Sequence, residues 1–353
     1  MIAARAAAAM ARGVERAGHA AHICPVGDGG EGTMDAVLHA VKGEVFTARV
    51  AGPLGDLVDA RWAMLADGTA IVELAEASGL QRVPCGALDP MKATTFGTGE
   101  LIRRAIARGC REVVVFAGGS ATIDGGAGAA QALGVRLFDD SGRDVAPPAG
   151  GVDLGVIARV APPEALPCRL RIACDVRNPL LGAHGAAAVY GPQKGATPQQ
   201  VVRLEECLRQ WAEVVGGDAD QPGAGAAGGV GFGLAALFGA TLEPGADLVL
   251  RLIRFEGRLK GIDLVMTGEG CLDAQTLEGK AVMAVAQAAQ RAGVPAIAIV
   301  GREEPGVSRC IASGGLLTTT FSMMTEFGER SLAEPEWCLE TAAMRVMANW
   351  AAA

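Results

Sequence analysis

The sequence predicts an α/β fold, in which a discontinuous Rossmann-like parallel-sheet domain carries an inserted mixed α/β domain. Strand, glycine loop and helix follow one another near the start of the chain and again towards its end. Between them, residues 44–73 alternate apolar and polar side chains around tight turns, as antiparallel strands do. We therefore expect the Rossmann-like domain at 1–45 and 260–353, the inserted domain at 46–259, and the active site in the cleft between them.

The composition excludes several classes of protein. The chain has 353 residues, which suffice for two domains with hydrophobic cores. Its net charge of −8 argues against a nucleic-acid-binding protein, which needs a stripe of basic residues. No apolar run is long enough to span a bilayer, and the alanine-rich start lacks a signal-peptide cleavage pattern. The nine cysteines never form a CxxC pair, so we expect them to be reduced thiols in the cytoplasm. From the charge and the hydropathy we expect neither a membrane nor nucleic acid as a partner.

The first elements are a helix expected over 2–17, a short strand over 22–25, and a helix over 34–41. The loop GDGGEGT precedes the second helix, and its four glycines with Asp28 and Glu31 exceed what a capped turn needs. This loop predicts cation or hydroxyl binding, with capping by Asp28 or Thr33 as the alternative.

Three strands are then expected within residues 44–74, followed by a helix that ends at residue 108. The segment ELAEASGL at 73–80 connects them. Its carboxylates, Glu73 and Glu76, either face the cleft or cap a helix.

The stretch VVVFAGGSATIDGGAGAAQALG at 113–134 is the centre of the predicted site. A β-branched strand over 113–116 ends in a loop with four glycines, two hydroxyls and Asp124, and a helix over 127–133 follows. Free N–H groups and the helix dipole at such a junction favour an anion. Because Asp124 would repel phosphate, it either binds a metal ion beside the phosphate or caps the helix.

Polar residues also follow two later strands. The strand over 169–174 ends in DVRN, which places Asp175, Arg177 and Asn178 at the sheet edge where α/β proteins bind ligands. Arg177 suits a clamp on a carboxylate, and an ion pair with Asp175 is the alternative. Further elements are expected as a helix over 198–215 and a glycine-rich turn over 216–233 that leads into a tightly packed helix. A strand over 262–267, a helix to 292, strands over 295–300 and 317–321, and a helix over 334–351 follow.

The inventory of residues favours phosphoryl transfer. The sequence has no Walker A, GxSxG or HExxH pattern, and its four histidines are scattered. Glycine loops, loop carboxylates and the isolated Lys194, Lys280 and Arg177 are what this reaction needs. Backbone amides and lysines bind phosphate, carboxylates bind Mg²⁺, and one aspartate deprotonates the attacking hydroxyl.

Seven motifs in collinear order resemble bacterial glycerate kinase of the first type. They are GDGGEGT at 27–33, ELAEASGL at 73–80, GGSATIDGGAG at 118–128, DVRNPLLG at 175–182, GPQKGA at 191–196, PGAGAAGGVG at 222–231 and TGEGCLDAQTLEGK at 267–280. The resemblance spans nearly the whole chain. It implies the glycerate kinase I-like two-domain fold, and phosphorylation of D-glycerate with ATP and Mg²⁺, usually to 2-phosphoglycerate.

With this reaction in view, each candidate residue receives a predicted role. Asp175 and Asp273 are candidates for the base or a metal ligand, because each follows a strand in a polar loop. Lys194 and Lys280 would neutralise developing charge. The substrate would be held by Arg177, Asn178, Asp28 and Glu31, the ATP phosphates by Gly118, Gly119, Ser120, Thr122, Asp124, Gly125, Gly268 and Glu269, and the metal by Asp273 and Asp124.

The sequence departs from the family at two points. The family's opening strand and loop, of the form APDSFKGSLSA, have no counterpart here, so we expect lower stability than in a longer relative. Ile123 stands where the family often has Asn. The alternatives are a kinase for a related hydroxy acid, a D-glycerate kinase that gives 3-phosphoglycerate, or an inactive truncated binding remnant. We expect a monomer or a homodimer.

Overall fold

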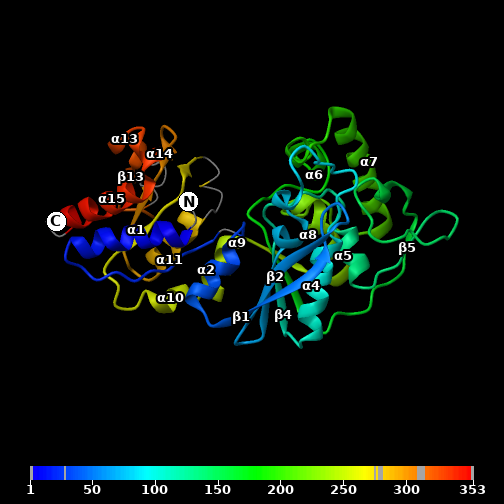
Figure 1. Cartoon of the computed structure of the whole chain (residues 1–353), viewed down its shortest axis with the longest axis horizontal. Coiled ribbons are helices and arrows are strands. Elements are labelled where there is room, and N and C mark those ends of the chain that lie inside the picture. Colours follow the sequence, from blue (N-terminus) through cyan, green and yellow to red (C-terminus); the bar gives the residue numbers. More distant parts are fainter. Residues whose placement is uncertain (1–2, 28, 274–275, 277–280, 308–314, 351–353) are drawn as a thin grey trace. The chain divides into compact units, whose positions relative to one another are not determined.

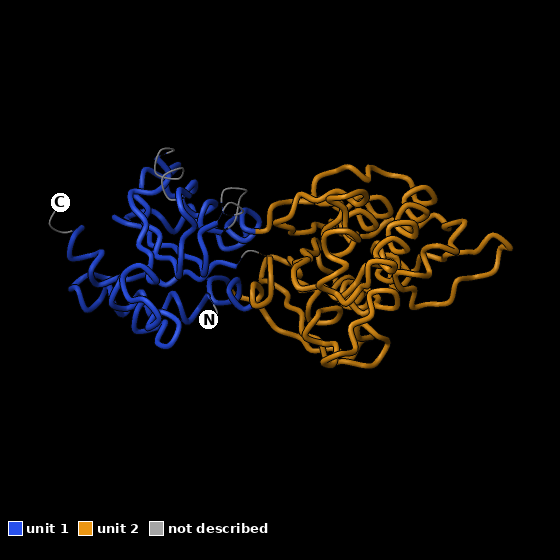
Figure 2. Tube along the Cα trace, turned by 90° about the horizontal axis from the view of Figure 1, so that it is seen from above, with its two compact units in different colours: residues 1–28, 35–41, 246–353 blue, residues 29–34, 42–245 orange. Residues whose placement is uncertain are grey.

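The computed structural model describes residues 3–27, 29–273, 276, 281–307 and 315–350. The chain divides into two compact units (Figure 2). The first comprises residues 1–28, 35–41 and 246–353, and the second comprises 29–34 and 42–245. The domain boundaries and the cleft of the sequence analysis stay predictions.

The second unit contains a six-stranded sheet, in the order β1-β2-β3-β4-β7-β8. The strands are β1 (Gly43–Ala51), β2 (Leu57–Leu65), β3 (Thr69–Glu73), β4 (Glu112–Phe116), β7 (Arg169–Ala173) and β8 (Thr241–Glu243). The first three pair antiparallel, as the alternating pattern predicts. From β3 onward the neighbours are parallel, so β3, β4, β7 and β8 share one carboxyl edge.

Two hydrophobic clusters form the core of the second unit. One gathers Trp62, Leu101, Val113 and Val115, and the other gathers Ile123, Trp211 and neighbouring leucines. The helices of this unit are α3 (Leu74–Ser78), α4 (Phe96–Ala107), α5 (Ala127–Ala132), α6 (Ala186–Tyr190), α7 (Pro198–Val215) and α8 (Ala226–Phe238). The remaining elements are a small antiparallel pair, β5 (Leu137–Phe138) and β6 (Arg159–Val160), and 3-10 turns at Leu80–Arg82, Asp153–Val156 and Pro192–Lys194.

The first unit contains a parallel sheet in the order β13-β11-β9. Its strands are β9 (Val265–Thr267), β11 (Ala296–Val300) and β13 (Thr319–Ser322), with a separate parallel pair of β10 (Cys271–Leu272) and β12 (Arg302–Glu303). Its helices are α1 (Ala3–Arg16), α10 (Phe255–Arg258), α11 (Ala281–Arg291), α13 (Met323–Phe327), α14 (Arg330–Ala333) and α15 (Pro335–Trp350). A unit boundary falls within α2 (Thr33–Ala40) and another within α9 (Gly245–Leu252).

Helices α1 and α15 lie side by side in the first unit (Figure 1). Ion pairs join Arg12 and Arg16 to Glu340, at 2.9 and 2.7 Å. Gly13 faces the backbone of Glu340 so closely that a Cβ atom would collide with it. The amphipathic start of the chain therefore packs as a helix, as predicted.

The mixed α/β fold class with a parallel-sheet domain is confirmed. The predicted strand over 22–25 is wrong, because residues 19–27 form neither helix nor strand. Ile23 there is 40% exposed, and residues 22–25 pair with no described strand. None of the helices in the described ranges combines the length and apolar character of a membrane span.

Candidate active site

The carboxyl edge of the parallel strands gathers several predicted motifs in the second unit. Gly118 and Gly119 follow β4, and Asp175 follows β7. The loop over 29–34 lies beside them, because the Gly118 amide donates to the Gly29 carbonyl at 3.1 Å. A Cβ atom on Gly118 would lie only 2.7 Å from Cα of Gly30. Two glycine loops that are far apart in the sequence therefore form one site, at the edge where α/β sheets bind ligands.

Two carboxylates border these joined loops. Asp175 is half-buried, and its Oδ1 accepts a hydrogen bond from the Gly245 amide at 2.9 Å. Its Oδ2 lies 3.5 Å from the position that a Cβ atom on Gly29 would take. The exposed Glu31 places Oε1 3.1 Å from the corresponding position on Gly119. Asp175 and Glu31, predicted from separate motifs, thus both lie against the glycine loops.

Asp124 is completely buried and serves as a cap for two helices. Its Oδ2 accepts hydrogen bonds from the Thr95 amide at 2.7 Å, the Thr95 hydroxyl at 2.6 Å and the Gly128 amide at 3.3 Å. Its Oδ1 accepts from the Gly126 amide at 3.2 Å. Thr95 precedes α4 and Gly126 precedes α5. Burial raises the pKa of Asp124, and these hydrogen bonds oppose that shift. The contacts are those of the capping alternative, and the metal role stays a prediction.

Lys194 lies beneath the loop that follows β4. Its ammonium donates to Ser120 Oγ at 2.6 Å and to the Thr122 carbonyl at 2.8 Å, and the side chain is almost fully buried. Burial lowers the pKa of Lys194 to about 7, and the nearby charge of Asp124 partly offsets the shift. The lysine therefore holds the loop after β4 through two hydrogen bonds. Its charge is sensitive to pH near neutrality.

The predicted substrate residues after β7 have different surroundings. Asn178 uses both ends of its amide, since Nδ2 donates to the His184 carbonyl at 2.8 Å and Oδ1 accepts from the Tyr190 hydroxyl at 2.6 Å. Arg177 is exposed, and it has no ion-pair partner in the part of the chain that the structure describes. The alternative Asp175–Arg177 ion pair is thus not formed, and the substrate roles of both residues stay predictions.

The predicted residues of the first unit gather after β9. Gly268 follows that strand in the sequence and packs against Ile299. A Cβ atom on Gly268 would collide with the Ile299 carbonyl. The Thr276 hydroxyl donates to Glu269 Oε1 at 2.7 Å, and the Thr276 amide donates to Asp273 Oδ1 at 3.1 Å. Glu269 and Asp273 therefore lie around one threonine.

Three further points concern the predicted ligands. Asp28 and Lys280 lie outside the described residues. Gly125 packs against Trp211, whose indole donates to the Gly125 carbonyl at 3.0 Å. Within the described ranges, no group of three His, Cys, Asp or Glu side chains is arranged to hold a metal ion.

The sequence predicts that Glu73 faces the cleft or caps a helix, without specifying which helix. Glu73 makes no side-chain capping bond to its own helix α3. Its buried carboxylate instead accepts from the Met34 amide at 2.7 Å. No local pattern predicts a contact that spans 39 residues.

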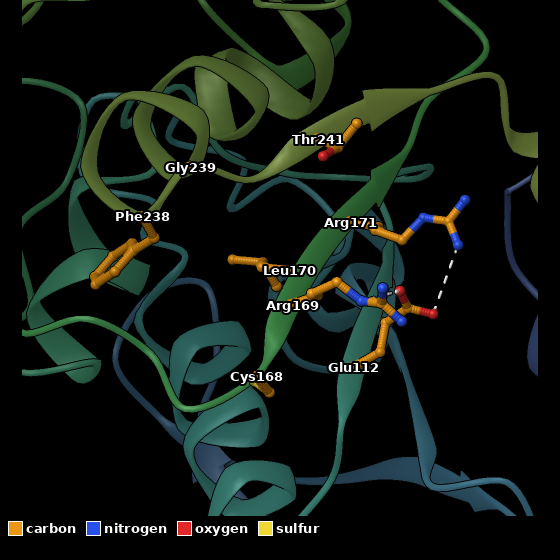
Figure 3. A pocket seen from close by; sticks show the side chains of 8 residues that line it. All are labelled: Glu112, Cys168, Arg169, Leu170, Arg171, Phe238, Gly239 and Thr241. Carbon is orange, nitrogen blue, oxygen red and sulfur yellow. Dashed lines mark ion pairs between the residues drawn. The ribbon is translucent and has the colours of Figure 1, made fainter.

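A cavity of about 560 Å³ lies at the opposite, amino ends of the strands. Figure 3 shows Arg169 and Arg171 turned toward Glu112 there. Their ion pairs with Glu112 span 3.3 and 3.5 Å. Arg171 also pairs with Glu243. Among the described residues that line this cavity, none is a predicted site residue. Its charged groups neutralise one another across the strands, so we do not assign the site to it.

The profile of the glycerate kinase family matches residues 1–351. The chain belongs to the glycerate kinase family. A glycerate kinase of Halalkalibacterium halodurans is 40% identical, with 99% of this chain and 95% of the relative aligned. A glycerate 2-kinase of Escherichia coli is 41% identical, with 86% and 81% aligned. The crystal structure of a protein assigned as glycerate kinase 2 from Salmonella typhimurium LT2 is 39% identical and superposes with a TM-score of 0.84, covering 99% of this chain and 94% of that one.

These findings confirm the family resemblance, and with it the assignment of the chain as a kinase. Two of the seven motifs that resemble the family, at 27–33 and 118–128, have backbones that meet in the second unit. The two glycine loops and Asp175 are therefore the part of this family member where we test the site first.

We expect Gly118→Ala to lower kcat/KM of this family member by about 100-fold. The added Cβ would lie 2.9 Å from the Gly29 carbonyl oxygen as well as 2.7 Å from Gly30 Cα, so the two loops must separate. Steady-state kinetics measure the effect, with circular dichroism as a check on folding. Gly257→Ala is the matched control, because nothing lies within 4 Å of its added Cβ. Equal activity of the two variants would contradict the joined-loop site.

We expect Lys194→Met to abolish a pH dependence of stability. The unfolded chain keeps this proton up to pH 10.5, whereas the folded protein loses it near pH 7. Stability should therefore rise with pH across that window, by up to about 1.4 kcal/mol per pH unit. Urea unfolding of wild type and variant measures the difference, and titrating thiols common to both cancel. Lys92→Met, at a side chain that is 78% exposed, is the control. If the free energy of unfolding depends on pH in the same way for Lys194→Met and wild type, the lowered pKa of the buried Lys194 amine is contradicted.

Proposed function

We propose that this chain phosphorylates the 2-hydroxyl of D-glycerate with ATP and Mg²⁺, giving 2-phosphoglycerate. The observation that carries the proposal is the junction of the Gly29–Gly30 and Gly118–Gly119 backbones, with Asp175 and Glu31 beside it. Family membership and the Escherichia coli relative named a glycerate 2-kinase support it. Small glycine loops allow close approach of phosphate, and the carboxylates supply a base.

In this proposal, Asp175 accepts the proton that the 2-hydroxyl loses as its oxygen attacks the γ-phosphorus of ATP, and ADP leaves. Ser120 and the amides of the loop after β4 bind the transferred phosphoryl group. Lys194 keeps Ser120 in place through its 2.6 Å hydrogen bond. Glu31 contacts the hydroxyl groups of glycerate. These groups are preorganised around the place where charge develops.

The donors present fit a magnesium ion. Glu269 and Asp273 offer the carboxylate oxygens that Mg²⁺ prefers, and both lie around Thr276. Asp124 fits less well, since its oxygens already accept four hydrogen bonds. When bound with ATP, Mg²⁺ neutralises charge on the phosphates.

The described cysteines are free thiols, which supports a cytoplasmic enzyme.

A coupled ADP-release assay with D-glycerate, ATP and Mg²⁺ tests the function, and phosphorus NMR identifies the product. We expect ADP release that depends on all three components and a signal of 2-phosphoglycerate. A 3-phosphoglycerate signal would overturn the proposed position of transfer. Turnover with another hydroxy acid but not with D-glycerate would overturn the substrate, and no turnover with any of them would support the binding remnant.

A further inference from the structure

Glu73 ends β3 at the same edge of the sheet as the glycine loops. The side chain belongs to a residue that is only 3% exposed. Its Oε1 accepts from the Met34 amide at 2.7 Å, and its Oε2 accepts from the Gly32 amide at 3.4 Å. The Met34 amide is in the first turn of α2 and the Gly32 amide directly precedes that helix, where backbone N–H groups have no partner within it. Glu73 thus caps a helix that is remote in the sequence.

The loop that Glu73 holds is also braced internally. The Thr33 hydroxyl donates to the Gly30 carbonyl at 2.7 Å and accepts from the Gly29 amide at 3.2 Å. Gly29 in turn accepts from Gly118. The position of Glu31, which lies between these anchored residues, therefore depends on Glu73 at one end and on the loop after β4 at the other.

A buried carboxylate is costly unless hydrogen bonds and nearby positive charge compensate it. The two amides and the amino end of the α2 dipole supply that compensation. A neutral glutamine has one acceptor oxygen in place of two, and its NH₂ group would face an amide donor. The charge of Glu73 is therefore matched to this loop geometry.

We propose that Glu73 is a positioning residue of the active site, which holds the 29–34 loop so that Glu31 stays beside Gly119. The inference rests on the proposed function. Glu73 acts through the loop backbone, and its effect on catalysis is the placement of Glu31. A misplacement of such a group by about 1 Å is enough to slow a reaction about 100-fold.

Glu76 provides a matched control three residues along the chain. It is also buried, at 8% exposed, but its carboxylate binds Arg61 at 3.0 Å and Arg82 at 2.7 Å. Glu73→Gln and Glu76→Gln each remove one buried negative charge. Only the first removes an acceptor from the 29–34 loop.

The experiment compares the full-length wild-type protein with both variants in two measurements. Hydrogen exchange of the peptide covering 29–40 reports the loop without any need for activity. The second measurement is kcat and KM for D-glycerate. We expect Glu73→Gln to exchange about 10-fold faster in this peptide and to lose about 10- to 100-fold in kcat/KM. We expect Glu76→Gln to change neither value.

The remaining outcomes decide against one proposal or the other. Unchanged exchange in Glu73→Gln, faster exchange without a kinetic loss, or equal effects in Glu76→Gln would each overturn the role of Glu73. If Glu73→Gln does not fold, Glu73→Asp replaces it, since this variant keeps the charge but shortens the reach; wild-type exchange and kinetics would then overturn the role. A wild-type protein without turnover contradicts the proposed function instead, and the exchange measurement still tests the loop anchor.

Discussion

Asp175→Asn is expected to lower kcat by about 1,000-fold while the protein stays folded, because an amide does not accept the proton of the attacking hydroxyl. The asparagine keeps the size of the side chain. Its carbonyl oxygen can still accept the hydrogen bond that Gly245 donates to Oδ1 at 2.9 Å. The loss should therefore fall on kcat, with KM for D-glycerate changing little.

Steady-state kinetics and thermal melting measure this prediction together. Asp153→Asn is the matched control, since Asp153 is also half-buried in the second unit and accepts one backbone hydrogen bond, from Gly150 at 2.8 Å. The control should keep wild-type kcat. Near-wild-type turnover of Asp175→Asn would remove Asp175 as the base and leave Asp273 as the remaining candidate.

Asp124→Ala is expected to destabilise the protein by about 4 kcal/mol or more, since each unsatisfied buried donor costs about 1–3 kcal/mol. The change leaves the Thr95 amide and hydroxyl and the Gly126 and Gly128 amides without this acceptor. The site is completely buried, so water does not replace the carboxylate without a rearrangement. The starts of both α4 and α5 should loosen.

Urea unfolding measures the loss, and Asp139→Ala is its control. Asp139 accepts a similar set of hydrogen bonds, from the amides of Ser141 and Arg143 and from their side chains. Ser141 and Arg143 are exposed, so water can satisfy their donors after the change. Asp124→Ala should therefore be far more destabilising than Asp139→Ala. A similar small effect of both changes would show that Asp124 is not a buried cap of two helices.

Local patterns in the sequence were sufficient for most elements. The helix predicted over 198–215 matches α7, because Thr197 and Gln200 form a capping box at its start and Gly216 follows its end. The strand predicted over 113–116 extends by one residue in β4. These elements are fixed by caps and apolar periodicity, which neighbouring residues carry.

The site was harder to predict because its contacts join distant segments. Glycine content identified the loops at 27–33 and 118–126, but nothing in either loop specifies that the other packs against it. The depth of Lys194 and the contact of Glu73 with α2 likewise depend on tertiary packing. For Asp124 the sequence left capping and metal binding open, and Thr95, 29 residues away, supplies two of the four observed contacts.

Because the two units are interleaved in the sequence, cutting the gene between them separates residues that form one site. The second unit comprises residues 29–34 and 42–245, and residues 35–41 of the first unit interrupt it in the sequence. A fragment that starts at residue 42 retains the sheet, Gly118 and Asp175 but lacks Gly29 and Glu31. Recombination or truncation between these segments would separate the two halves of the glycine junction.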